Sequence, residues 1–180
     1  MFTVDTVYTV TITDTVEAVK VLRASFWGVP SVLDESPAVL RTAGLSKRIR
    51  KEVIFDDIFP AFPKGKVTAI TGQNGAVKTT LAQILCGLAR QTRGHILIDG
   101  EKARAVVRRR EIYHCGIFSG RRILILDEPT SGLDGQNMRL IAERLRSEAR
   151  NGRTILVITH DRELIESCCD NIVDVEKRSS

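Results

Sequence analysis

The spacing of apolar residues predicts alternating strands and helices over most of the chain. Lys66–Ile70 is strand-like, Ile123–Leu126 is a continuous apolar run typical of a strand buried on both faces, and a further buried strand is predicted within Thr154–Asp161. Helical spacing covers Thr80–Arg90 and Gly135–Arg150, where Asn151-Gly152 supplies a stop signal. Strands that alternate with helices indicate an α/β fold with a parallel sheet and right-handed crossovers.

Shorter patterns extend this core at both ends. Val39–Leu45 and Lys51–Ile58 alternate as antiparallel strands of a small β-subdomain, and His95–Ile98 is expected to join them. A short helix over Asp161–Cys168 and a last strand over Asn171–Val175 complete the predicted elements. Within the segment Lys102–Gly116, the run Arg108–Glu111 is expected to be helical and exposed.

The first 36 residues form a separate, unassigned segment. Apolar residues of one parity in Phe2–Val16 predict a half-buried strand, and an amphipathic helix is expected from Val16 to Phe26. Ser31–Pro37 has the composition of a linker. We therefore divide the chain into residues 1–36 and a main domain over residues 37–180.

The sequence TGQNGAVKTT at Thr71–Thr80 lies between a predicted strand and a predicted helix and resembles a phosphate-binding loop. Glycine, four residues, glycine, lysine and serine or threonine make a loop whose amides cradle phosphates. The candidate nucleotide-binding residues are Gly72, Gln73, Asn74, Gly75, Ala76, Val77, Lys78, Thr79 and Thr80.

Three of these residues carry most of the interpretation. Lys78 would place a charge on the β- and γ-phosphates, and the Thr79 hydroxyl would ligate Mg²⁺. Val77 stands where the pattern requires its second glycine. Because valine is stiff and costly at positive φ, we expect a loop that keeps the fold but binds nucleotide weakly. The alternative is a simple turn between strand and helix.

Acidic residues follow the second buried strand. Asp127 ends that strand and Glu128 comes next, where an open α/β sheet places metal and water chemistry. Asp127 would hold the metal through water or Thr79, and Glu128 would polarise an attacking water. His160 follows the third buried strand.

These segments, with RILILDEPTSGLD at Arg122–Asp134 and TILVITHD at Thr154–Asp161, resemble the ATP-binding subunit of ABC transporters. The resemblance covers about residues 38–100 and 117–176, and the energy-coupling-factor type is the nearest subfamily. It implies a P-loop ATPase fold with ATP and Mg²⁺ as ligands. Glu128 would be the general base, His160 would contact the γ-phosphate, and Asp134 would sit at a dimer seam. The implied partners are a second ATPase domain and an integral membrane subunit, at the cytoplasmic face of the membrane.

Other features of that family are missing. Lys78 and Asp127 are only 49 positions apart, and no LSGGQ signature or glutamine loop lies between them. The main domain is therefore expected to be shortened between residues 100 and 118, without most of a helical subdomain. Ile49 lies near the place of the family's adenine-stacking tyrosine and offers no π-face. A non-hydrolysing pseudo-ATPase and a decayed, internally deleted fragment remain alternatives.

Composition and charge bear on nucleic-acid binding, membrane insertion, secretion and the state of the cysteines. The net charge is +5, with basic clusters at Lys47–Lys51 and Arg104–Arg110, but few aromatic residues accompany them. Nucleic-acid binding is thus a lesser alternative to a solvated face. The sequence has no apolar run long enough to span a membrane, and strand-like Met1–Val10 argues against a signal peptide. Four cysteines (Cys86, Cys115, Cys168 and Cys169) are expected to be reduced, mostly buried thiols.

Overall fold

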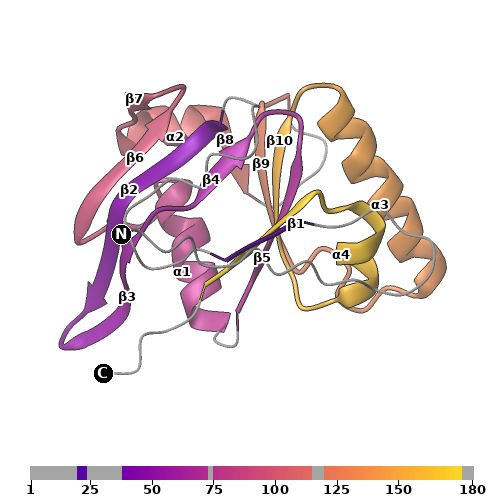
Figure 1. The fold of residues 1–180 in the computed structure, drawn as a ribbon, viewed down its shortest axis with the longest axis horizontal. Coiled ribbons are helices and arrows are strands. Elements are labelled where there is room, and N and C mark those ends of the chain that lie inside the picture. The colour runs from indigo at the N-terminus through magenta and orange to yellow at the C-terminus, as the bar shows by residue number, and fades with distance from the viewer. Residues whose placement is uncertain (1–19, 24–37, 73–74, 115–119, 176–180) are drawn as a thin grey trace, which may run out of the picture.

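The protein consists of two sheets packed around a shared core (Figure 1). In this computed structural model, the chain is described at residues 20–23, 38–72, 75–114 and 120–175. The predicted strand at Phe2–Val16 and linker at Ser31–Pro37 lie outside these ranges. No helix within them is long and apolar enough to cross a membrane.

A six-stranded, fully parallel sheet forms the centre, in the order β1-β11-β5-β10-β9-β8. Its strands are β1 (Lys20–Arg23), β5 (Val67–Thr71), β8 (Ile112–His114), β9 (Ile123–Asp127), β10 (Thr154–Ile158) and β11 (Asn171–Asp174). The helices are α1 (Gly75–Leu85), α2 (Ala105–Glu111), α3 (Gly135–Arg150) and α4 (Arg162–Cys168). The predicted parallel α/β architecture is confirmed.

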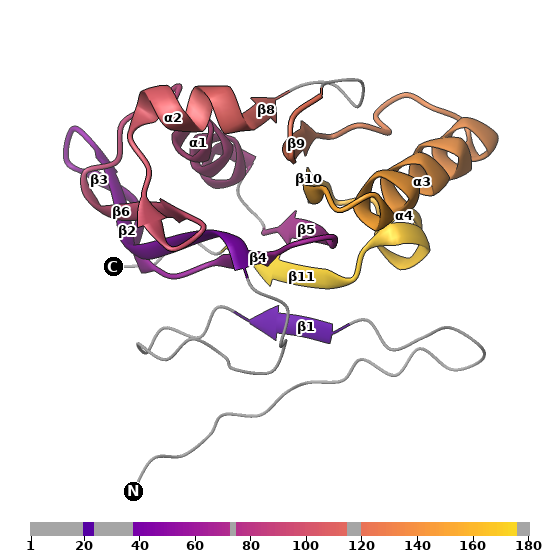
Figure 2. The ribbon, with the colours of Figure 1, turned by 90° about the horizontal axis from the view of Figure 1, so that it is seen from above.

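Both faces of this sheet are buried, which explains the continuous apolar runs. Ile70, Ile125 and Ile158 point to one face and join the core with α1 and the second sheet. Their neighbours along each strand point the other way, so Ala69 and Val157 pack with α3 and α4. Figures 1 and 2 show α3 and α4 on the opposite side of the central sheet from α1.

The second sheet is the predicted antiparallel β-subdomain. It has the order β3-β2-β6-β7, and β4 pairs with β2 beside this path. Its strands are β2 (Ala38–Ile49), β3 (Glu52–Ile58), β4 (Ala61–Pro63), β6 (Arg93–Ile98) and β7 (Glu101–Lys102). Pairing of β6 with β2 confirms the expectation for His95–Ile98.

The helix expected from Val16 to Phe26 is wrong where the structure describes it. Lys20–Arg23 is β1, which pairs in parallel with β11 and gives the central sheet an additional edge strand. The local spacing of apolar residues suited a helix, but the ladder with β11 supplies interstrand hydrogen bonds that no local pattern reveals. Tertiary pairing therefore overrides the local signal.

The segment at Arg108–Glu111 is helical as expected, within α2, but it is not exposed throughout. Arg108 is buried, and its Nη1 donates to the carbonyl oxygen of Ala103 at 2.5 Å. Burial, and secondarily the charge of Arg109, lowers the pKa of Arg108. The prediction failed because the guanidinium turns inward to bind the backbone.

The cysteines described in the structure agree with the sequence-based expectation. Cys86, Cys168 and Cys169 are buried thiols that form no disulfide within the described part of the chain. A hydrogen bond with Cys168, together with burial, raises the pKa of Cys169. The Cys169 thiol is therefore held in the protonated form. Cys115 lies outside the described residues.

Candidate nucleotide-binding site

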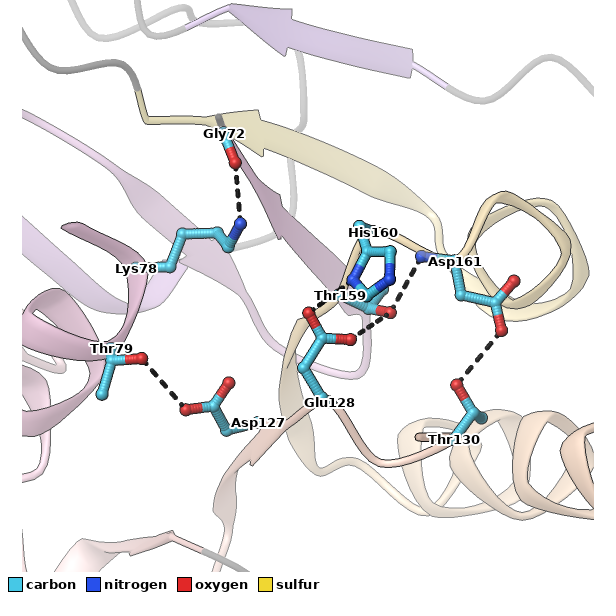
Figure 3. Close-up of polar contacts among 9 residues, drawn as sticks. All are labelled: Gly72, Lys78, Thr79, Asp127, Glu128, Thr130, Thr159, His160 and Asp161. Atoms are coloured by element: carbon cyan, nitrogen blue, oxygen red, sulfur yellow. Dashed lines mark hydrogen bonds and ion pairs between the residues drawn. The ribbon is translucent and has the colours of Figure 1, made fainter. Parts of the chain in front are cut away.

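The candidate residues gather at the carboxyl edge of the central sheet. Strand β10 lies between β5 and β9, and all three run in the same direction. The residues that follow these strands therefore meet at one edge, as Figure 3 shows for Gly72, Glu128 and His160. This edge is where open α/β sheets bind their ligands.

Helix α1 begins inside the predicted loop. The sequence placed its start at Thr80, whereas the structure places it at Gly75, five residues earlier, and its end at Leu85. The glycine-rich pattern favoured a loop, but a phosphate-binding loop ends in a helical first turn whose amides have no intrahelical acceptor. Ala76 and Thr80 lie on this helix, exposed and half-buried respectively, while Gln73 and Asn74 lie outside the described residues.

Val77 does not have the strained backbone that its position suggested. Non-glycine residues with positive φ among those described are Arg50, Asp57, Asp99 and Glu128, and Val77 is not one of them. Its side chain is 1% exposed and packs into the core shared by α1 and both sheets. The expected penalty at positive φ is therefore wrong, because Val77 is helical and its side chain is buried.

Gly72 and Lys78 are in direct contact. Gly72 has a φ of +145°, and a Cβ there would lie 2.2 Å from the carbonyl oxygen of Val175. No other residue fits this position, since the chain after β11 passes too close. The Lys78 Nζ donates to the carbonyl oxygen of Gly72 at 2.7 Å, so the buried ammonium lies against the loop.

Thr79 and Asp127, the two predicted metal ligands, lie within hydrogen-bonding distance of each other. The Thr79 hydroxyl donates to Oδ2 of Asp127 at 3.3 Å (Figure 3). Within the described ranges, no group of three or more His, Cys, Asp or Glu residues is placed to hold a metal. Two oxygens without a protein cage suit Mg²⁺, which is commonly held by one or two side chains together with phosphates and water.

Glu128 is fixed from several directions. It has a φ of +46°, in the left-handed region, and its amide donates to the carbonyl oxygen of Ile158 at 2.8 Å. Its Oε1 lies 2.8 Å from Nδ1 of His160, whose side chain is 83% exposed. Strained backbone of this kind concentrates at functional sites. The structure thus brings together the two residues that the sequence nominated for catalysis.

Three further polar residues at this edge were missed. Thr159 donates to Oε2 of Glu128 at 3.2 Å and accepts from the amide of Asp161 at 3.1 Å. The Thr130 hydroxyl donates to Oδ2 of Asp161 at 3.1 Å. These bonds tie the loop after β9 to the loop after β10 (Figure 3). In the sequence, Thr130 lies close to the acidic pair and Thr159 lies next to the histidine. These hydroxyl residues were the signal from which the contacts could have been predicted.

Asp134, predicted at a dimer seam, begins a helix. It is the N-cap of α3, and its Oδ1 accepts from the amide of Asn137 at 2.8 Å. The side chain is exposed at the surface. The capping hydrogen bond gives Asp134 a structural role that needs no partner chain. Because its side chain is exposed, a partner chain could also contact it.

Comparison with known proteins gives one consistent set of similarities. A family model described as "ABC transporter" matches residues 55–118. A second, described as "AAA domain, putative AbiEii toxin, Type IV TA system", matches residues 97–166. A putative ABC transporter ATP-binding protein of Treponema denticola is 28% identical over 181 aligned positions, covering 67% of this chain and 37% of the relative.

Another relative and a solved structure also carry names of ATP-binding or ABC transporter proteins. Nod factor export ATP-binding protein I of Ralstonia nicotianae is 25% identical and covers 78% of this chain and 65% of the relative. The chain thus spans 37% to 65% of the length of these two relatives. The solved structure of cbiO1 from Clostridium perfringens, described as part of the ABC transporter complex cbiONQ, has a TM-score of 0.68 at 21% identity, covering 77% of this chain and 85% of that one. Its likeness supports the fold alone.

Proposed function

Because the chain belongs to the ATP-binding proteins of ABC transporters, we propose that it binds MgATP at the carboxyl edge of its central sheet and powers solute transport through a separate membrane subunit. Proteins of this family generally bind ATP with Mg²⁺. The observation that carries the proposal is the meeting of Lys78, the Thr79–Asp127 pair and the Glu128–His160 pair at one edge.

Each residue has a role that its contacts support. The first turn of α1 and Gly72 would face the phosphates, and Lys78 would exchange its bond with the Gly72 carbonyl for a β- or γ-phosphate oxygen. Thr79 and Asp127 would hold Mg²⁺, which supplies charge neutralisation on the phosphates. Val77 packs inward, so its side chain leaves the phosphate side of the loop open.

Hydrolysis would depend on Glu128. A carboxylate that accepts from Thr159 and faces His160 is oriented to accept a proton from water, or to orient that water, in front of the γ-phosphate. The exposed His160 would contact the γ-phosphate. Rate enhancement in phosphoryl transfer comes mainly from such positioning and charge stabilisation.

The proposed partners are a second ATPase domain and an integral membrane subunit, at the cytoplasmic face of a membrane. The alignment with the Treponema denticola protein is longer than the part of this chain within it, so that relative has residues that this chain lacks. This supports a shortened main domain without its own signature segment. A partner half would then complete the site of this chain, with Asp134 near the seam.

MgATP binding is tested by thermal unfolding of the purified chain. A ligand that binds only the native state stabilises it by about 2.7 kcal/mol at a hundredfold excess over Kd. We expect a shift in the natural chain that Lys78→Ala abolishes. The exposed Lys64 provides the control, since Lys64→Ala removes a lysine without touching the loop. An equal shift in the Lys78 and Lys64 variants would contradict the proposal.

A non-hydrolysing, ATP-binding half is the second candidate, because the sequence lacks the signature segment. Release of phosphate from MgATP distinguishes the two. The ATPase proposal expects slow release that Glu128→Gln reduces further. A thermal shift without any release, alone or with a signature-bearing half, would favour the pseudo-ATPase.

A further inference from the structure

The buried side chain of Thr159 both donates and accepts a hydrogen bond. The residue is 0% exposed, so water does not reach the hydroxyl. Its Oγ1 accepts from the amide of Asp161 at 3.1 Å, and an amide can only donate. The hydroxyl proton is therefore donated to Oε2 of Glu128, which lies 3.2 Å away.

From this arrangement we infer that Thr159 is a positioning residue that fixes the proton pattern of the Glu128–His160 pair. The inference rests on the proposed role of Glu128 as the base. Because Thr159 donates to Oε2, residue 128 must present an acceptor on that side. If the carboxylate is ionised, its Oε1 is also an acceptor, so Nδ1 of His160 carries the proton.

This pattern has a consequence for the exposed edge of the histidine. With Nδ1 protonated towards Glu128, Nε2 of a neutral His160 ring is an acceptor. Through Glu128, Thr159 thereby sets which hydrogen-bonding group His160 presents at its exposed edge.

The anchor of Thr159 extends into both loops. Asp161, which donates to it, begins α4 by accepting from the amide of Leu164 at 3.3 Å and also accepts from the Thr130 hydroxyl. Thr130 and Thr159 are both buried. The hydroxyl that orients Glu128 is thus held by a helix N-terminus and by the loop that carries Glu128 itself.

The first test replaces the carboxylate by an amide, which has one acceptor and one donor. In Glu128→Gln, Thr159 should hold the amide oxygen, so that the amide NH₂ faces Nδ1 of His160. We expect the neutral ring to change from the Nδ1–H to the Nε2–H tautomer, read from the ¹⁵N shifts of His160. In the double variant Glu128→Gln/Thr159→Val, the amide is free to turn and both tautomers should appear.

Thr154 offers a matched control on the same strand. It is 1% exposed, and its hydroxyl donates to the carbonyl oxygen of Pro63 at 3.2 Å, at the opposite end of β10. Glu128→Gln/Thr154→Val should keep the Nε2–H tautomer. If Glu128→Gln alone retains Nδ1–H, or if the Thr159 and Thr154 double variants behave alike, the inference is wrong.

The second test uses activity and includes a conservative rescue. Thr159→Val should lower kcat for ATP hydrolysis by about tenfold with KM unchanged, since misplaced catalytic groups cost one to two orders of magnitude. Thr159→Ser keeps a hydroxyl and should restore most of kcat, and Thr154→Val should match the natural chain. Equal kcat values in Thr159→Val and Thr154→Val would overturn the inference. If no variant hydrolyses ATP, the enzymatic proposal fails while the tautomer measurement still decides the role of Thr159.

Discussion

At the scale of single residues, the structure changes the interpretation of Val77. The motif pattern marks it as a defect, since glycine is required there for backbone freedom. In the structure it lies on α1 and its side chain is buried in the main core. Val77 thus contributes to folding stability, and its isopropyl group packs into the core.

Substitution of Val77 tests these two statements. Val77→Gly should lower the free energy of unfolding by about 3 kcal/mol, from roughly 2 kcal/mol of lost burial and about 1 kcal/mol of glycine in a helix. Val77→Ala keeps the helix propensity and should lose about 2 kcal/mol. Urea unfolding of the ligand-free chain measures both losses.

Nucleotide binding by Val77→Ala gives the corresponding control. Because the removed methyl groups face the core, the stabilisation by saturating MgATP should equal that of the natural chain. A much larger MgATP effect in Val77→Ala would mean that the valine does obstruct the loop, as the motif pattern alone suggests.

At the scale of elements, Asp134 caps a helix at a position where the sequence predicts a dimer contact. The resemblance places it at a dimer seam, whereas the structure gives it a hydrogen bond to Asn137 that begins α3. An N-cap satisfies one of the amides that a helix leaves unpaired at its start. Both roles use the same carboxylate, so stability and assembly must be measured separately.

We expect Asp134→Ala to lower the free energy of unfolding of the monomer by about 1 kcal/mol through loss of the cap. Asp134→Asn keeps a side-chain oxygen and should retain nearly all of that stability. Thermal unfolding at low protein concentration measures the effect without a dimer. Equal stability of the Ala and Asn variants would mean that the cap contributes nothing.

The sequence predicts elements whose signal is local and misses those set by distant contacts. β9 and β10 are recognisable because strands buried on both faces are continuously apolar. β1 was misread because its structure depends on a ladder with β11, about 150 residues away. In the site, Lys78 and Asp127 follow from motifs, but the role of Thr159 depends on a carboxylate 31 positions away.

At the scale of the whole molecule, the two sheets are joined by a polar contact as well as by the core. Arg122, directly before β9, bonds Asp99 through Nη1 at 2.6 Å and Glu111 through Nε at 2.7 Å. Asp99 follows β6 of the antiparallel sheet, and Glu111 ends α2. The hydrogen bond with Asp99, and then that with Glu111, raises the pKa of Arg122 despite partial burial. One guanidinium thus connects the segment before β9 with the end of α2 and the residue that follows β6.

Removal of this guanidinium should have a modest, salt-dependent cost. Exposed ion pairs contribute about 0.2–1 kcal/mol each, so Arg122→Ala should lower the free energy of unfolding by about 1 kcal/mol at low salt. At 1 M salt, where the Debye length is about 3 Å, the loss should shrink markedly. Chemical denaturation with urea, which adds no ions, measures the loss at both salt concentrations.

Arg139 separates the effect of bridging from the effect of removing an arginine. Its single contact with Glu163 is 3.8 Å long between side chains that are 76% and 58% exposed. Arg139→Ala should therefore leave stability unchanged at either salt concentration. If both variants lose the same stability, the bond between the sheets contributes nothing specific, and the hydrophobic core around α1 alone holds the β-subdomain against the central sheet. If only Arg122→Ala loses stability, the polar contact helps to hold the β-subdomain against the central sheet.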